Sequence, residues 1–159
     1  MDGAPQGTDM TQAGRASELL KELTGDWMIR RAVQHSDGSQ TRALGWTQIK
    51  PERGRWRFHE TGILILASGA ELKFERSYLW YDAGAAIDVH YDDDRPFHRI
   101  TVGARARDRH ICGSDIYNVA YDFDMPGAWQ SRWRVEGPRK SYYMVSQYRQ
   151  PRSSAPGRG

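Results

Sequence analysis

Apolar and polar residues alternate with a period of two along most of the chain after Trp27. The clearest run is Glu71–Tyr81, in which Leu72, Phe74 and Tyr78 alternate with charged or polar positions. Successive side chains of a strand point to opposite faces, so this period predicts half-buried β-strands. We expect strands at Trp27–Val33, Thr41–Ile49, Trp56–Ile65, Glu71–Tyr81, Ala86–Tyr91, Phe97–Arg105, Ile116–Phe123, Trp129–Val135 and Ser141–Arg149.

The connections between these runs are short and rich in turn-forming residues, as in Ser36–Ser39 and Met125–Gly127. Gly113–Lys140 is predicted to be a hairpin, into which Asp108–His110 leads. Many short strands with tight turns are typical of an all-β fold, and we expect a closed antiparallel barrel of about eight to ten strands. A two-sheet sandwich is the alternative.

Helical spacing is seen in one segment, Ala16–Thr24, where three leucines share a stripe. Ser17 is the expected N-cap and Gly25 the expected stop. The segments 1–14 and 151–159 are polar and contain Gly and Pro, so we expect disordered ends around one domain at 15–150.

The 159 residues carry a formal net charge of +3 and a single cysteine, which excludes an internal disulfide. No signal-peptide pattern or membrane-length apolar run is visible, so we expect a cytoplasmic protein that does not bind membranes. Positive and negative residues are interspersed along the sequence, and no basic stripe indicates nucleic acid. The oligomeric state stays open.

Three charged residues, Arg31, Glu60 and Arg76, fall in the apolar phase of their strands. A charge on an inward face is costly unless it is paired, so one interpretation is a buried ion-pair network such as Glu60 with Arg76. The other is a ligand pocket in which an arginine is left to bind an anionic or carbonyl-bearing molecule. Against a pocket, several tryptophans could fill the interior, namely Trp46, Trp56, Trp80, Trp129 and Trp133.

The densest group of reactive side chains comprises His98, His110, Cys112 and Asp115. A Cys–His–Asp set can activate a thiol nucleophile, and either histidine could act as an acid or base. His110 and Cys112 share a strand face and could both reach a metal ion, but no second paired motif accompanies them. A structural role for the cysteine and the histidines is the third interpretation. No attachment motif indicates haem, and we expect no metal and no cofactor.

The segment from Leu19 to Trp27, with Leu23-Thr24-Gly25-Asp26-Trp27 at its end, resembles the opening of the lipocalins, or calycins. That resemblance implies a short helix at the barrel base and Trp27 packed beneath a basic residue, with Arg139 and Arg149 as candidates. Three further motifs resemble a family of uncharacterised lipocalin-like single-domain proteins: Arg95-Pro96-Phe97-His98, His110-x-Cys112-x-x-Asp115-x-Tyr117 and Trp133-x-Val135-x-Gly137-Pro138-Arg139-Lys140. The match covers roughly Leu19 to Arg149 and implies a fold but no activity.

Together these observations favour binding of a small, partly apolar, anionic or carbonyl-bearing ligand inside a lipocalin-like barrel. The expected ligand contacts are Arg31, Glu60, Arg76, Tyr78, Tyr117, Trp133 and Arg139. The alternative is a small cofactor-independent enzyme (an isomerase, cyclase or hydrolase) that uses His110, His98 or Cys112. A protein-interaction module without a pocket is a third hypothesis.

Overall fold

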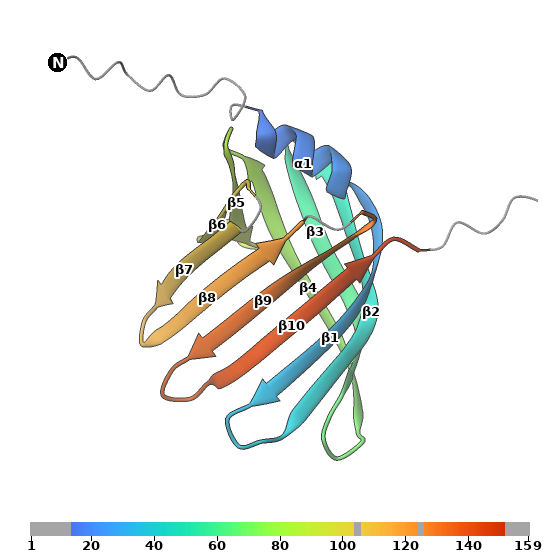
Figure 1. The fold of residues 1–159 in the computed structure, drawn as a ribbon, viewed down its shortest axis with the longest axis vertical. Coiled ribbons are helices and arrows are strands. Elements are labelled where there is room, and N and C mark those ends of the chain that lie inside the picture. The colour runs from blue at the N-terminus through green and yellow to red at the C-terminus, as the bar shows by residue number, and fades with distance from the viewer. Residues whose placement is uncertain (1–13, 104–105, 124–125, 152–159) are drawn as a thin grey trace, which may run out of the picture.

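A single antiparallel sheet of ten strands curls into a nearly closed barrel (Figure 1). The computed structural model describes residues 14–103, 106–123 and 126–151. Its elements are α1 (Arg15–Leu23), β1 (Gly25–His35), β2 (Gln40–Glu52), β3 (Arg55–Ile65), β4 (Glu71–Asp82), β5 (Ala86–Tyr91), β6 (Pro96–Thr101), β7 (Ala106–Cys112), β8 (Asp115–Asp122), β9 (Ala128–Glu136) and β10 (Ser141–Arg149). The predicted all-β barrel with one short helix is therefore confirmed.

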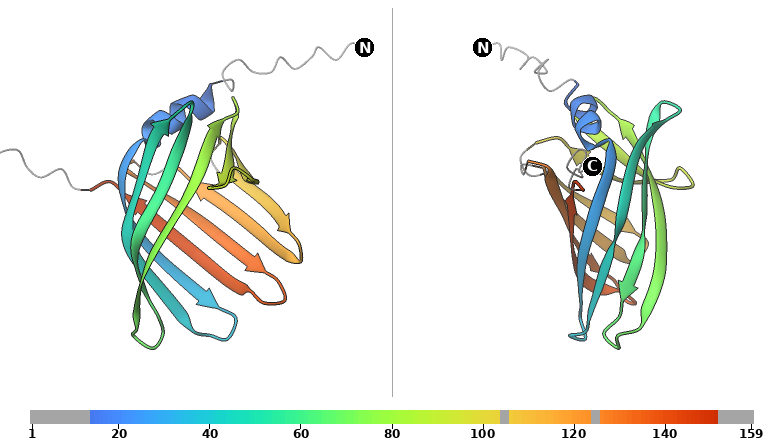
Figure 2. Two further views of the ribbon diagram at one scale, coloured as in Figure 1. Left: turned by 180° about the vertical axis from the view of Figure 1, so that it is seen from behind. Right: turned by 90° about the vertical axis from the view of Figure 1, so that its right-hand side faces the viewer.

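The strands follow one another around the wall in the order β6-β5-β4-β3-β2-β1-β10-β9-β8-β7. The expectation of a fully closed barrel is wrong in one detail, since no ladder joins β6 to β7 in the part of the chain described. A side chain bridges the two edges instead, because the backbone N–H of Arg99 donates to Oδ2 of Asp108 at 2.6 Å. Figure 2 shows the two walls of the barrel from behind and from the side.

The sequence prediction missed one strand, β7, and extended the preceding strand beyond Thr101; the last two residues of that predicted strand, 104 and 105, lie outside the described residues. β6 ends at Thr101, and β7 then pairs with β8 along its whole length. The apolar signal is absent from β7 because Asp108 and His110 occupy one of its faces and Arg107 and Arg109 the other. A strand without apolar alternation cannot be recognised by its period.

Helix α1 covers one end of the barrel (Figures 1 and 2) and buries Ala16, Leu19, Leu20 and Leu23. The helix begins after Gly14, whose φ of 98° suits glycine, and it has no side-chain cap. Ser17 therefore lies inside the first turn, and its expected role as N-cap is wrong. Gly25 is the first residue of β1. No helix in the described ranges is long and apolar enough to span a membrane.

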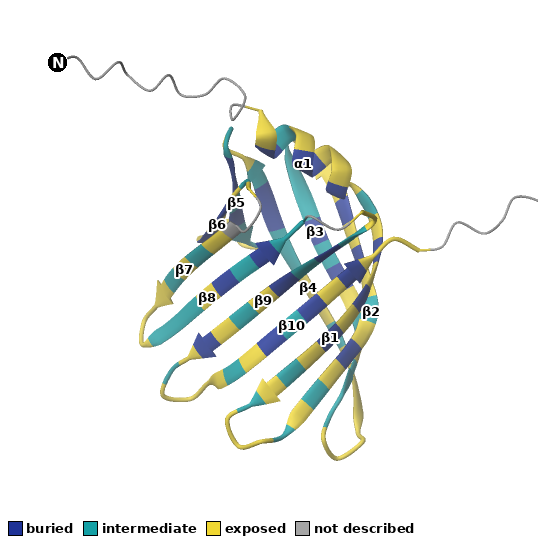
Figure 3. Ribbon diagram, in the orientation of Figure 1, coloured by how far each residue is buried: buried dark blue, intermediate teal, exposed yellow. Residues whose placement is uncertain are grey.

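The core is an aromatic stack beneath α1. Trp129 lies parallel to Tyr148 with ring centroids 3.7 Å apart, and Phe58 lies parallel to Trp80 at 5.0 Å. Trp27 is 4% exposed, and its Nε1–H donates to the carbonyl of Leu23 at 2.8 Å. Burial alternates along the strands, as the bands in Figure 3 show.

The expected basic partner of Trp27 is wrong. Its ring meets the edge of Trp129 at 6.1 Å, while Arg139 and Arg149 are both exposed. Arg139 lies in the turn after β9, and Arg149 pairs with Met28 in register and shares its outward phase. Trp46 is also not part of the interior, because it is 49% exposed on the outer face of β2.

Strands β2 and β3 approach each other closely at two facing glycines, Gly45 on β2 and Gly62 on β3. A Cβ on Gly45 would overlap the carbonyl oxygen of Thr61, and a Cβ on Gly62 would overlap that of Leu44. The ring of Phe74 lies against Gly62. Glycine here permits a close approach of two backbones that any side chain would block.

Candidate functional site

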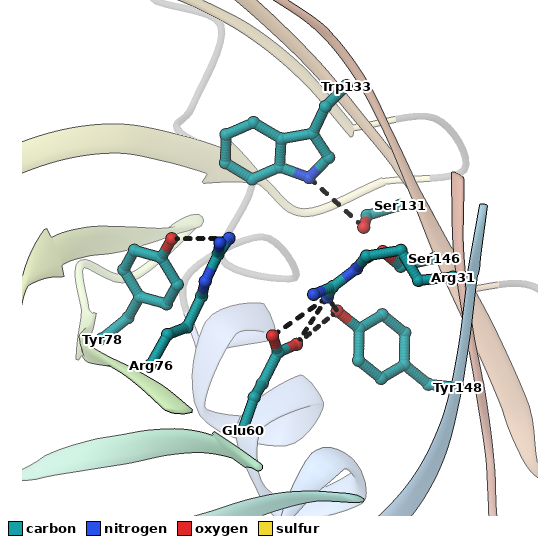
Figure 4. A network of polar contacts seen from close by, with 8 residues as sticks. All are labelled: Arg31, Glu60, Arg76, Tyr78, Ser131, Trp133, Ser146 and Tyr148. Carbon is teal, nitrogen blue, oxygen red and sulfur yellow. Dashed lines mark hydrogen bonds and ion pairs between the residues drawn. The ribbon is translucent and has the colours of Figure 1, made fainter. Parts of the chain in front are cut away.

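A buried polar network crosses the barrel between β1 and β3 (Figure 4). Nη2 of Arg31 donates to both carboxylate oxygens of Glu60, at 2.9 and 3.0 Å, and Nε donates to Oγ of Ser146 at 2.6 Å. The Tyr148 hydroxyl donates to Oε1 of Glu60 at 2.8 Å. Arg31 is 7% exposed and Glu60 is 1% exposed, so the pair is almost fully withdrawn from water.

The network keeps its ionisation against the effect of burial. Burial by itself lowers the pKa of Arg31, but its electrostatic interactions and hydrogen bonds with Tyr148 and Glu60 outweigh this effect, and the pKa rises. Burial, followed by the charge of Glu60, raises the pKa of Tyr148. The guanidinium is therefore charged and the phenol neutral at any ordinary pH, and Glu60 is the counter-ion of Arg31.

Arg76 stands outside this pairing. Although Arg76 is directly opposite Glu60 in the β3–β4 register, Glu60 turns to Arg31. The predicted pair of Glu60 with Arg76 is thus replaced by Glu60 with Arg31. Among the described residues the polar partner of Arg76 is the Tyr78 hydroxyl, 3.4 Å from Nη1, and no carboxylate lies within ion-pair distance. Figure 4 shows Arg76 beside Tyr78, apart from the Arg31–Glu60 pair.

The cavity between these groups is small. It encloses about 20 Å³, which is room for about one water molecule. Aromatic side chains therefore fill much of the interior, which was the alternative set against a large pocket. The residues around the cavity are Arg31, Phe58, Glu60, Arg76, Tyr78, Trp80, Val89, His98, Tyr121, Trp129, Ser131, Trp133, Met144 and Tyr148.

Three cavity residues carry buried polar atoms without a partner in the described part of the chain. These atoms are Nε1 of Trp80, Nε1 of Trp129 and Nδ1 of His98. An indole N–H can only donate, and a buried donor left unmatched costs roughly 1–3 kcal/mol. A rearrangement that brought either indole N–H to an acceptor atom would remove this cost.

His98 is a buried, neutral residue of this wall. Its Nε2 lies 2.9 Å from the Tyr121 hydroxyl, and burial lowers the pKa of His98 to about 3, with a smaller opposing effect of Asp108. Its ring lies edge-on to Phe97 at 4.7 Å. The neutral imidazole can exchange hydrogen bonds with Tyr121, but it does not carry a proton at neutral pH.

The other predicted catalytic residues lie at the open end of the barrel and are not joined to His98. The ring of His110 packs edge-on against Phe97 at 5.1 Å. Cys112 is exposed, and its thiol makes no hydrogen bond with any described residue. Asp115 faces Lys140, whose Nζ is 4.0 Å from Oδ2. Across the described ranges no three His, Cys, Asp or Glu side chains are placed to hold a metal ion. An activated thiol needs a base in contact, and this geometry does not supply one.

The remaining predicted ligand contacts divide into two groups. Trp133 lines the cavity, and its Nε1–H donates to Oγ of Ser131 at 3.3 Å. Tyr117 is half-buried nearer the rim, with its hydroxyl 3.3 Å from Nζ of Lys140. Arg139 is exposed in the turn between β9 and β10, and the structure does not bring it to the cavity.

Sequence reasoning missed several polar residues of the interior. Ser146 and Tyr148 form hydrogen bonds with the Arg31–Glu60 pair. Ser131 accepts the indole N–H of Trp133, and Tyr121 is hydrogen-bonded to His98. For the two serines the available signal was a small hydroxyl residue on a buried face, which indicates a hydrogen-bond partner nearby.

Solved structures share this architecture. An S-type phycobiliprotein lyase, CPES, from Guillardia theta superposes with a TM-score of 0.70 at 10% sequence identity, covering 94% of this chain and 100% of that one. A DUF3598 protein of unknown function from Nostoc punctiforme superposes with a TM-score of 0.56 at 9% identity, covering 81% of this chain and 47% of that one. At such identities the likeness establishes the fold alone.

Sequence comparison gives the family. No curated protein matches the chain. A family model matches residues 23–150, which take in the whole sheet and the cavity wall. The chain therefore belongs to the family of unknown function DUF6314.

Proposed function

We propose that the protein binds a small, partly apolar ligand through a carboxylate or carbonyl group held by Arg76. The observation that carries the proposal is the missing counter-ion, since Glu60 is committed to Arg31 and the nearest described polar partner of Arg76 is a phenol. Arginine keeps its charge in any protein environment, so the guanidinium is a standing site for an anion.

Two neutral phenols, Tyr78 and Tyr142, interact with the charge of Arg76. Burial raises the pKa of Tyr78, and burial also raises the pKa of Tyr142, so both phenols stay protonated at neutral pH. Trp80 and Trp129, whose buried indole N–H groups have no partner among the described residues, also line the cavity. Such donors suit an oxygen acceptor better than a cation.

The cavity size limits where the ligand can lie. About 20 Å³ admits the polar end of a ligand in place of one water molecule, while Arg76 itself is exposed at the rim. The apolar part of the ligand then rests on the half-buried rings of Tyr78 and Tyr91. Both rings pack on the buried Phe97, at 6.0 and 4.3 Å between centroids. A larger ligand would require these rings to move.

The test is titration of the protein with a panel of aromatic acids, fatty acids and a bilin, followed by tryptophan quenching. The bilin is included because the structural neighbour is named a phycobiliprotein lyase. Arg76→Met should weaken binding of the acids by roughly 10- to 100-fold, as loss of a charged hydrogen bond does. Lys73→Met removes the same charge from the opposite face of β4 and should leave binding unchanged.

Two results would overturn the proposal. One is the absence of quenching by every member of the panel with the unmutated protein. The other is an equal affinity of the Arg76→Met variant, provided that its circular dichroism and melting temperature match those of the parent.

A further inference from the structure

The outer wall of the barrel carries a group of arginines that the ligand site does not use. Arg107 and Arg109 on β7, and Arg132 and Arg134 on β9, are exposed and form what is called here the arginine cluster. These two strands flank β8 in the front wall of Figure 1.

Strand register places the cluster in two rows. Arg107 pairs with Ala120, and Ala120 pairs with Arg132. Arg109 pairs with Asn118 in the same way, and Asn118 pairs with Arg134. Paired residues of antiparallel strands point to the same side, so all four guanidinium groups project outward. The rows are about 7 Å apart along each strand, and the two arginines of one row are about 10 Å apart.

The small residues of β8 leave a hollow between the arginines. Its volume is about 320 Å³, and Arg107, Arg132, Arg134, Asn118 and Ala120 are among its lining residues. The floor holds no large apolar side chain that could anchor a protein partner. An aromatic ring is present at its side, because Tyr143 is 39% exposed and the guanidinium of Arg134 lies 5.9 Å from its centroid.

The positive charge of the cluster is largely uncompensated. The side chains of Arg107, Arg109 and Arg132 make no hydrogen bond or ion pair with any described residue, whereas Arg134 lies 3.6 Å from Glu136. The carboxylate of Asp108 instead accepts the backbone N–H groups of Arg99 and Arg109. Asp122 is a further acid in the outward phase of β8, two residues beyond Ala120.

The row of Arg107 and Arg132 continues around the wall to Arg42 on β2, and these three arginines form what is called here the basic stripe. Arg132 pairs with Val145, Val145 with Ala32, and Ala32 with Arg42 on β2. From β7 to β2 this row spans five strand spacings, or about 24 Å. The sequence hides the stripe, because its arginines come from strands far apart in the chain.

We propose that this stripe binds single-stranded nucleic acid through its phosphate backbone. Unpaired guanidinium groups on a polar floor suit phosphates, and an exposed tyrosine beside them suits stacking of a base. A convex sheet wall does not enter a duplex groove as a helix or a two-stranded ribbon does, so a flexible single strand fits better than a duplex. The expectation of no nucleic-acid partner rested on the linear sequence, in which this stripe cannot be seen.

The experiment is fluorescence polarisation with a labelled oligo-dT of about 20 nucleotides, at KCl concentrations from low to physiological. Contact with three or four phosphates predicts a slope of log K against log salt of about −2 to −3. Arg107→Glu/Arg132→Glu should weaken binding at least tenfold. Lys50→Glu/Lys73→Glu makes the same change in net charge away from the cluster and should weaken it little.

Three outcomes would overturn the inference: no binding at low salt, an equal loss in both double variants, or displacement of the oligonucleotide by oligoglutamate at equal charge. The last would assign the wall to an acidic protein. Because the cluster side chains are exposed, circular dichroism should show an intact fold, and Arg107→Gln/Arg132→Gln provides a milder second variant. Neither double variant should alter ligand quenching through Arg76, so this proposal and the ligand proposal fail separately.

Discussion

Replacing Glu60 by Gln gives the sharpest test of the buried network. The amide keeps the size and shape of the carboxylate but removes the charge that faces Arg31. Arg31 is 7% exposed, and a guanidinium cannot release its proton, so the variant leaves a charge in the barrel without a counter-ion. The bonds from Arg31 to Ser146 and from Tyr148 to position 60 can remain.

The expected cost follows from this geometry. Breaking a buried ion pair by removing one partner costs about 3–5 kcal/mol, because the remaining charge stays desolvated. For a protein of 159 residues this corresponds to a fall in melting temperature of roughly 6–20 °C. Removing both charges together in Arg31→Met/Glu60→Met should cost far less than Glu60→Gln alone, since apolar side chains of similar volume need no partner.

Urea unfolding followed by circular dichroism measures these differences. The control is Glu75→Gln, which removes an exposed carboxylate 3.1 Å from His59 and should change the free energy of unfolding by less than about 1 kcal/mol. If Glu60→Gln costs no more than Glu75→Gln, or if the double variant is the least stable of the set, then the pair is not the desolvated unit that the structure describes.

Three other predictions concern pH, packing and the chain ends. Burial lowers the pKa of His98 to about 3, so between that pH and about 6.5 the unfolded chain binds a proton that the folded protein does not. As the pH falls through this range, the unfolding free energy should drop by up to about 1.4 kcal/mol per pH unit. Unfolding measured at pH 7 and at pH 5 should show a smaller drop for His98→Gln than for the parent protein. Gly45→Ala should lower the melting temperature because its Cβ meets the Thr61 carbonyl, whereas Gly103→Ala meets nothing within 4 Å; equal melting curves for the two would contradict the close approach of β2 and β3. Removing residues 1–13 and 152–159, which lie outside the described residues, should shift the melting temperature by less than about 3 °C, and a larger shift would place those segments in the folded domain.

Much of the barrel could be read from the chain alone. Period-two alternation located nine of the ten strands, because a side chain in a strand must choose between core and solvent. The same phase placed Arg31 and Glu60 on the inner face, where the structure finds them buried. β7 was not predicted, because both of its faces carry polar side chains and its sequence therefore shows no apolar alternation.

Partner choice was decided by the tertiary structure. Phase shows which residues face inward, but not which of two arginines Glu60 will meet across the barrel. The curvature of the wall carries Arg31 from β1 to Glu60 on β3 and leaves Arg76, its neighbour in register, with a phenol. The size of the cavity likewise depends on how rings from six strands interlock, which strand periodicity does not contain.

The basic stripe on the outer wall has the same origin. Arg42, Arg107 and Arg132 are separated by 25 or more residues in sequence, and acids are interspersed between them. Strand register aligns them in one row because β7, β9 and β2 share a single sheet. Local alternation is a property of neighbouring residues and is visible in the sequence, whereas pairing across a barrel depends on long-range register and is visible only in the fold.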